Sequence, residues 1–252
     1  MAAHDADNGP VLYDREGEVA VITLANPPVN ALSKEVRAGI AAHLETALAD
    51  GDVTAIVVAG AGRNLCGGAD IREFNTPARD AWPMSRELMN IIEASTKPVV
   101  AAVRGPTLGG GLELAMGCHY RVADVGARLG MPEVLRGIVP GAGGTQRLPR
   151  LIGLKPALDM ITSGDAISSA KAHELGLVDD VSEPDPSGAA VRTVAIAFAE
   201  KVVAEGIGPR RISEMNVPGD LADNEAIVEE YRAALEKSAR GVKAPFRCLE
   251  AV

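Results

Sequence analysis

Two glutamates are the side chains of this sequence best suited to proton transfer. Glu113 lies in the first turn of an expected helix that is apolar nearly all round, with Leu112, Leu114, Ala115 and Met116 as its neighbours. A carboxylate in such surroundings must be paired, hydrogen-bonded or functional, because an isolated buried charge is costly. Glu133 follows Met131-Pro132 in a turn between apolar segments. Taken singly, Glu113 could simply complement the helix dipole, and Glu133 could be a solvated loop residue.

Two glycine-rich loops can supply main-chain N–H donors. Gly109-Gly110-Gly111 precedes the helix of Glu113. The N–H of Gly110 is therefore expected at a helix N-terminus, where the dipole favours negative charge and no side chain obstructs a ligand. The turn Gly67-Gly68-Ala69 can supply a second N–H, from Ala69. Rigid N–H groups stabilise negative charge that develops on an oxygen during a reaction. A single glycine-rich loop is usually an ordinary turn, so the occurrence of both loops is what points to chemistry.

The elements that must position these residues alternate between strands and helices. The expected elements are strands at 18–24, 54–59 and 98–103, a helix capped by Ser33, and helices at 84–94 and 112–117. The strands are apolar throughout rather than alternating, which is typical of a sheet covered by helices on its faces. The fold class is therefore α/β.

The last third of the chain has a different character. Helices are expected at 189–204 and 221–239, the second of them acidic on its outer side. We predict one continuous chain with an α/β core at 1–205 and a helical C-terminal segment at 206–252.

Composition and charge exclude several classes of protein. A net charge of −9 and an aromatic content of 3% argue against a nucleic-acid partner. The acidic segment Met1 to Pro10 has no apolar run, so it is not a signal peptide, and no run of about 18 apolar residues could span a membrane. Cys66, Cys118 and Cys248 form no CxxC pair and are expected to be buried thiols rather than disulfides or metal ligands. We expect a cytoplasmic protein with no metal and no membrane partner.

Familiar cofactor and nucleophile motifs are missing or incomplete. Gly60-Ala61-Gly62 begins like a dinucleotide-binding loop, but Leu65 occupies the position of the third glycine. The sequence contains no GxxxxGK[ST], no GxSxG and no HExxH. His119 follows Cys118 directly, and we expect both residues to be structural.

Two segments resemble the enoyl-CoA hydratase/isomerase (crotonase) superfamily. The first is NLCGGADI at 64–71. The second runs from 98 to 148 and contains GGGLELA, GMPE and PGAGGTQRL. Smaller similarities are NPPVNAL at 26–32 and the strand and loop expected at 178–181. The resemblance extends over about residues 12–205.

The resemblance implies a crotonase-like spiral of ββα units followed by helices that assemble the protein into trimers or hexamers. We expect the apolar helix faces between 189 and 239 to be buried in that assembly. The implied substrate is an acyl-CoA thioester, and no separate cofactor is implied because coenzyme A is part of the substrate.

The resemblance also assigns roles to the residues above. It places an oxyanion hole at Ala69 and Gly110 and a catalytic pair at Glu113 and Glu133. Two carboxylates that share a water can deliver its hydroxyl and a proton. We therefore expect an enoyl-CoA hydratase, a lyase that adds water in syn fashion to trans-2-enoyl-CoA in fatty-acid β-oxidation or related metabolism. Further substrate contacts are expected at Gly67, Gly68, Asp70, Ile71 and Gly141.

Several alternatives stay open. A 3,2-enoyl-CoA isomerase can work with a carboxylate at the position of Glu133 alone, and a non-catalytic acyl-CoA-binding or RNA-binding module could use the same scaffold. The sequence departs from the commonest family pattern at Leu65, where an aromatic residue is usual. It also ends early, and 243–250 resembles the end of a hydratase region in a multifunctional β-oxidation protein. Both a fragment and a short natural member fit this ending.

Overall fold

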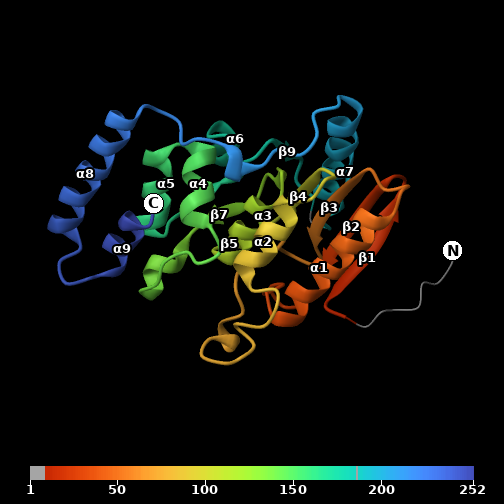
Figure 1. Ribbon diagram of the computed structural model, residues 1–252, viewed down its shortest axis with the longest axis horizontal. Helices are drawn as coiled ribbons and strands as arrows, with labels where there is room; N and C mark the ends of the chain where they lie inside the picture. Colours follow the sequence, from red (N-terminus) through yellow and green to blue (C-terminus); the bar gives the residue numbers. More distant parts are fainter. Residues whose placement is uncertain (1–8, 186) are drawn as a thin grey trace.

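The computed structural model describes residues 9–185 and 187–252, and it is built around a six-stranded sheet (Figure 1). The expectation that Met1–Pro10 is not a signal peptide concerns residues that lie mostly outside this part. The strand order is β1-β2-β3-β4-β6-β9, with β1 antiparallel to β2 and all other neighbours parallel. The strands are β1 (Val11–Glu16), β2 (Val19–Leu24), β3 (Ala55–Gly60), β4 (Val99–Val103), β6 (Tyr120–Asp124) and β9 (Asp180–Ser182).

A second sheet of three short strands lies beside the first. It consists of β5 (Pro106–Leu108), β7 (Arg128–Gly130) and β8 (Ala166–Ser168), in the order β5-β7-β8. The chain passes from β4 in the large sheet to β5 in the small one and then into α3 (Gly110–Gly117), which makes one ββα unit. This arrangement confirms the α/β class and brings the glycines before α3 to the end of a strand.

Helices cover both faces of the large sheet, so alternate strand residues belong to two different cores. Ile56 and Val58 of β3 face the larger core, which also contains residues of α1 (Lys34–Ala49), α2 (Ser85–Glu93) and α3. Val57 faces the smaller core under α7 (Ala189–Ala204). Because α7 buries its apolar face on the sheet of its own chain, the expectation that this face serves subunit packing is wrong for α7.

The C-terminal helices pack at the far end of the molecule (Figure 1). Helix α8 (Leu221–Ser238) and helix α9 (Ala244–Glu250) contact α5 (Leu154–Ser163) through a cluster of Leu154, Leu158, Leu235 and Leu249. The predicted boundary at residue 205 falls between α7 and η3 (Ile212–Glu214). The remaining helices are α4 (Gly144–Ile152) and α6 (Ser169–Glu174). Among the described residues, no helix is both long enough and apolar enough to cross a membrane.

Most of the expected long elements are present, and the omissions have a physical reason. Strands β2, β3 and β4 lie within one residue of their expected bounds, and Ser33 caps α1 by accepting the N–H of Val36 at 3.4 Å. Strand β6 was not expected, because Arg121 interrupts its apolar pattern. That arginine is fully buried, donates to the carbonyls of Leu177 and Cys118 at 2.7 and 2.9 Å, and lies 3.7 Å from Asp179. Edge strand β1 and the short strands of the second sheet were also not expected.

Candidate active site

Glu113 is buried in the first turn of α3, as its apolar neighbours indicated. Its side chain is 3% exposed, and its Oε1 accepts the main-chain N–H groups of Ala142 and Gly144 at 2.7 and 2.8 Å. A Cβ on Gly144 would lie 3.0 Å from the same oxygen, so glycine lets this amide approach. Burial raises the pKa of Glu113, while the two N–H groups and the charge of Arg147 act in the opposite direction.

Glu133 lies near Glu113 and belongs to η2 (Pro132–Arg136), a short 3-10 helix where the sequence indicated a turn. Its Oε1 would lie 2.7 Å from a Cβ on Gly109, the residue that precedes α3 and has a φ of 52°. Its Oε2 is buried and has no hydrogen-bond partner among the described residues. Burial, and then the charge of Glu113, raise the pKa of Glu133 to about 7. The two carboxylates therefore share one site but have different surroundings.

The N–H groups of Ala69 and Gly110 lie beside each other. An ideal Cβ on Gly110 would be 3.0 Å from the nitrogen of Ala69. The carbonyl of Gly68 accepts the N–H of Leu32 at 2.9 Å in an isolated bridge. The carbonyl of Gly68 and the N–H of Ala69 belong to one trans peptide group and point in opposite directions, so the N–H of Ala69 points away from Leu32. Gly110 is the first residue of α3, where an N–H has no partner within the helix.

Close contact between the two glycine loops produces this arrangement. A Cβ on Gly111 would lie only 2.1 Å from the carbonyl oxygen of Cys66, and one on Gly68 would lie 3.0 Å from the carbonyl oxygen of Leu108. Gly68 has a φ of 117°, a conformation that side chains disfavour. The glycines are therefore required for the approach of two main chains as well as for turning.

The other expected contact residues lie around these groups. Gly67, Ile71 and Gly141 are exposed. Asp70 is buried and caps the 3-10 helix η1 (Ile71–Glu73), where it accepts the N–H of Arg72 at 3.0 Å and pairs with its guanidinium at 2.7 Å. This pairing lowers the pKa of Asp70. Its contacts hold the loop that contains Ala69.

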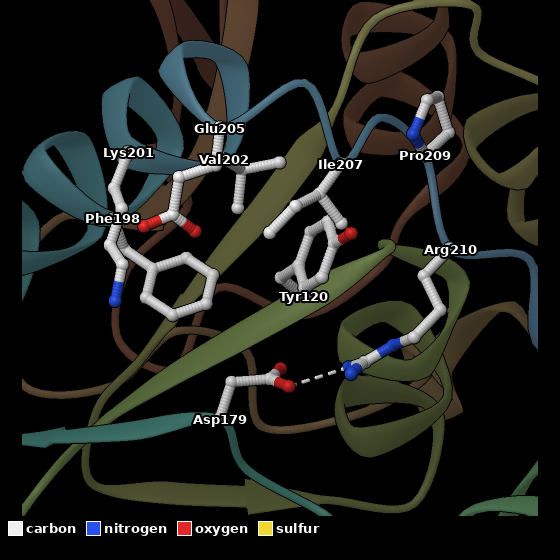
Figure 2. A pocket seen from close by; sticks show the side chains of 9 residues that line it. All are labelled: Tyr120, Asp179, Phe198, Lys201, Val202, Glu205, Ile207, Pro209 and Arg210. Atoms are coloured by element: carbon white, nitrogen blue, oxygen red, sulfur yellow. Dashed lines mark hydrogen bonds and ion pairs between the residues drawn. The ribbon is translucent and has the colours of Figure 1, made fainter.

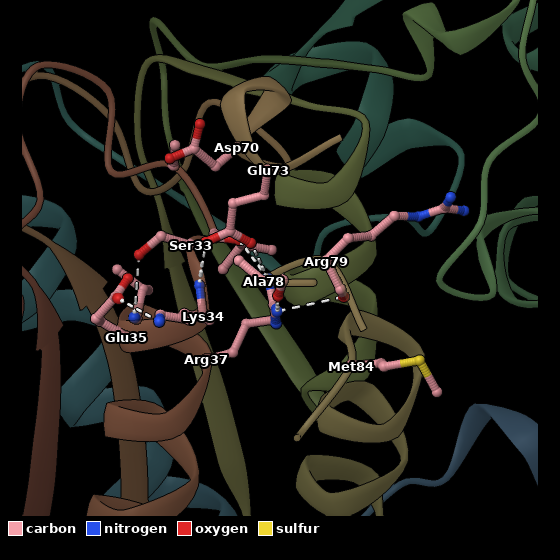
Figure 3. A network of polar contacts seen from close by, with 12 residues as sticks. Ser33, Lys34, Glu35, Arg37, Asp70, Glu73, Ala78, Arg79 and Met84 are labelled. Atoms are coloured by element: carbon pink, nitrogen blue, oxygen red, sulfur yellow. Dashed lines mark hydrogen bonds and ion pairs between the residues drawn. The ribbon is translucent and has the colours of Figure 1, made fainter. Parts of the chain in front are cut away.

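A buried arginine that the sequence analysis did not single out fixes the same loop (Figure 3). Arg37 of α1 is 3% exposed and pairs with Glu73 at 2.9 Å, while Glu73 accepts the N–H of Lys34 at 2.7 Å. Arg37 also donates to the carbonyls of Leu32, Ala78 and Pro83 at 2.8–2.9 Å. Its position was a usable signal, because it shares the buried side of α1 with Ile40 and Leu44, three and seven residues on.

The histidine and the cysteines that drew attention in the sequence are buried side chains, and Cys66 belongs to the loop of Ala69. His119 is fully buried and accepts the N–H of Val99 at 3.0 Å, and its other ring nitrogen lies 3.0 Å from the carbonyl oxygen of Glu93. All three cysteines are free and buried. Within the described residues, no group of three or more His, Cys, Asp or Glu side chains could hold a metal ion.

A cavity lies away from these groups, beside Tyr120 at the start of β6 and beside α7 (Figure 2). It has a volume of about 480 Å³ and contains none of the residues expected to act on a substrate. Its charged Asp179 and Arg210 pair at 2.6 Å, and Arg210 lies 4.7 Å from the centre of the Tyr120 ring. The two charges thus pair with each other, although Nε of Arg210 is buried without a hydrogen-bond partner among the described residues.

Curated relatives are similar to nearly the whole of this chain. The peroxisomal bifunctional enzyme of Danio rerio is 50% identical over 234 residues, which cover 93% of this chain and 32% of that protein. The glyoxysomal fatty acid beta-oxidation multifunctional protein MFP-a of Brassica napus is 40% identical, over 93% of this chain and 33% of its own length. The chain thus spans about a third of the length of these relatives.

The compartments named for these relatives contradict the expected cytoplasmic location. A cytoplasmic location was expected because the N-terminus has no apolar run, but the relatives are named as peroxisomal or glyoxysomal proteins. Peroxisomal address signals are read by receptors and need no apolar N-terminal segment. The acidic N-terminus therefore could not distinguish the two compartments.

A solved structure and a family model agree with the curated relatives. The enoyl-CoA hydratase of Bacillus anthracis has a TM-score of 0.70 and 29% identity, and the alignment covers 92% of this chain and 97% of that one. The family model described as enoyl-CoA hydratase/isomerase matches residues 14–234. With the glycine loops and the glutamate pair in place, this chain belongs to the enoyl-CoA hydratase/isomerase family.

Proposed function

We propose that this chain hydrates trans-2-enoyl-CoA thioesters in fatty-acid β-oxidation. The observation that carries the proposal is the pair of carboxylates in one buried site. Glu113 accepts two main-chain N–H groups, and one oxygen of Glu133 has no partner within 9–185 and 187–252. The N–H groups of Ala69 and Gly110 beside α3 are suited to the oxygen of a thioester.

The surroundings of the two carboxylates favour different roles. Two N–H donors favour the ionised form of Glu113, which would hold a water and take its proton as the hydroxyl adds to the β-carbon. The enolate oxygen would be stabilised by Ala69 and Gly110. Glu133, with a pKa of about 7, is partly protonated at neutral pH and would deliver a proton to the α-carbon. One water is consumed, and proton exchange between the carboxylates restores the starting state.

This scheme moves only water and protons, and side chains and amides of the chain perform each step. We therefore propose that no separate cofactor takes part and that coenzyme A enters as part of the substrate. The compartment named for the relatives supports a peroxisomal setting for the reaction.

A 3,2-enoyl-CoA isomerase activity is the second candidate. The unpartnered Oε2 of Glu133 could remove a proton from one carbon of the acyl chain and return it to another. Such an activity would need only this carboxylate and the same oxyanion donors.

Replacing either glutamate by glutamine tests the proposed reaction. Glu113→Gln and Glu133→Gln should each lower the hydration of crotonyl-CoA by ~10²-fold or more, since each removes a general acid or base. The measurement is the loss of absorbance of the conjugated thioester, repeated with a long-chain enoyl-CoA. Near-full turnover in either variant at saturating substrate would exclude the paired mechanism. A wild-type chain that binds acyl-CoA without converting it would favour a binding module.

The raised pKa of Glu133 also predicts how stability depends on pH. A carboxyl with a pKa of about 7 in the folded chain and 4.5 as its ordinary value binds its proton more tightly when folded. The stabilisation of the fold by this proton is fully present below pH 4.5, and it is lost as the pH rises through about 7. The loss amounts to about 3 kcal/mol at most.

Glu133→Gln should not show this loss. Urea unfolding at pH 5 and pH 8 should therefore find the variant more stable than wild type at pH 8 by ~1–3 kcal/mol, with the difference shrinking at pH 5. An equal difference at both pH values would mean that the folded structure does not perturb this carboxyl.

Gly110→Val tests the oxyanion donors separately from the carboxylates. The added side chain would begin 3.0 Å from the nitrogen of Ala69 and so fill the space between the two N–H groups. Turnover should fall by ~10²–10³-fold, the usual effect of losing one such donor. Free coenzyme A should still bind, because its nucleotide end is expected at the Gly67 loop. Unchanged turnover in the folded variant would remove Gly110 from the mechanism.

We also propose that the chain assembles as a homotrimer, alone or paired into a hexamer. With α7 committed to its own sheet, the assembly would use α8 and the segment after it, where Leu235 is the only residue of α8 that is buried and Leu221 and Val242 are exposed. Sedimentation velocity over a range of concentrations should give a trimer or hexamer. A monomer that is independent of dilution would refute the proposal.

A further inference from the structure

A buried ion pair lies directly behind the loop that holds Glu113. Arg147 of α4 and Glu93 of α2 approach to 2.9 Å, and each side chain is 8% exposed. Arg147 also donates to Oδ1 of Asn90 at 3.0 Å, and the second oxygen of Glu93 accepts the N–H of Ser213 at 2.9 Å. The pair thus joins α4, α2 and η3 and leaves little freedom to the guanidinium.

The other side of the guanidinium packs against the 142–143 peptide, which lies between the two peptide groups that donate to Glu113. Its Nη1 lies 3.4 Å from the carbonyl oxygen of Ala142, whose own N–H donates to Glu113 at 2.7 Å. A Cβ on Gly143 would lie 2.2 Å from the same Nη1, and Gly143 has a φ of 103°. The loop at 142–144 is therefore held between the carboxylate of Glu113 and the guanidinium of Arg147.

The charges around Glu113 come from three elements. Arg147 of α4 favours its ionised form, Glu133 of η2 is the nearby carboxyl of like charge, and Glu93 of α2 pairs with Arg147. Buried ion pairs contribute little to stability in general, because desolvation offsets the attraction. A pair that only joined α2 to α4 would not need to contact the donor loop.

We infer that Arg147, held by Glu93, is a positioning residue. It fixes the two main-chain N–H groups that donate hydrogen bonds to Glu113. The inference depends on the proposed function, since it assigns Arg147 a part in the chemistry of Glu113 without contact to the substrate. A residue of this kind should affect kcat and the pH dependence of the reaction more than KM.

The test compares Arg147→Met, Arg147→Lys and Glu93→Gln with Arg150→Met as a matched control. Arg150 lies on the same helix, and its guanidinium bonds to the carbonyls of Met215 and Gln146 instead. For each folded variant, kcat and KM for crotonyl-CoA are measured across the pH range. Arg147→Met should lower kcat ~10–100-fold, the usual effect of a small misplacement, and change KM by less than about threefold. The control should behave as wild type.

The direction in which the acid limb of the pH–rate profile shifts is the decisive observation. Ionised Glu113 is the active form, so activity falls as the pH drops through its pKa. Without the positive charge of Arg147 this limb should move to higher pH, and without the negative charge of Glu93 it should move to lower pH. Arg147→Lys keeps the charge, so it should lower kcat but leave the limb in place. A folded Arg147→Met with wild-type kcat and an unmoved limb would overturn the inference. If Arg147→Met does not fold, unchanged profiles in both other variants would overturn it equally.

An infrared titration keeps this test separate from the proposed function. The band of the protonated carboxyl that disappears in Glu113→Gln reports the protonation of Glu113 without any turnover. If wild type does not hydrate crotonyl-CoA, the proposed function fails, but the band should still titrate at higher pH in Arg147→Met and at lower pH in Glu93→Gln. A band that titrates identically in wild type and both variants would refute the positioning role whatever the reaction.

Discussion

The burial of a carboxylate in an apolar helix is the constraint on which the rest of the site depends. Glu113 is surrounded by the larger core, where an uncompensated charge would shift to its neutral form. The structure compensates it with two main-chain N–H groups rather than with a direct ion pair. This solution requires a loop at 142–144 with glycines at two positions, and a support behind that loop. Helices α2 and α4 supply the support through Glu93 and Arg147.

A second constraint is the close approach of two main chains at the N-terminus of α3. Gly110 and Gly111 let this helix begin against the loop at 66–69, where a Cβ on Gly111 would lie only 2.1 Å from the carbonyl oxygen of Cys66. The same approach brings the N–H groups of Ala69 and Gly110 to one side, and the contacts of Arg37 and Asp70 hold the loop from behind. A rigid pair of donors is useful in catalysis because it needs no reorganisation when charge develops.

The two glutamates illustrate how environment separates groups of the same type. Both are pushed toward the neutral form by burial, but Glu113 accepts N–H groups from two other residues, whereas the hydrogen bond that lowers the pKa of Glu133 comes from its own main chain. Glu133 has one oxygen without a partner in the described part of the chain and a pKa of about 7, which is unfavourable for stability at neutral pH and favourable for proton transfer. In the proposed mechanism, one residue type thus supplies both the acid and the base.

The sequence by itself determined the α/β class and most of the long elements, and it singled out candidate residues for the chemistry, because these are local signals: apolar runs, glycine loops and a glutamate on an apolar helix. The family resemblance carried the pairing of Glu113 with Glu133, which lie twenty residues apart. Only the tertiary structure decided what surrounds each of them. The buried arginines at 37, 121 and 147 have partners 36, 58 and 54 residues away in the chain. Periodicity counts such residues as interruptions, since it cannot know which distant carboxylate or carbonyl will meet them. The packing partner of α7 was also decided by the tertiary structure. In the sequence, an apolar helix face looks identical whether it packs on its own sheet or on another subunit.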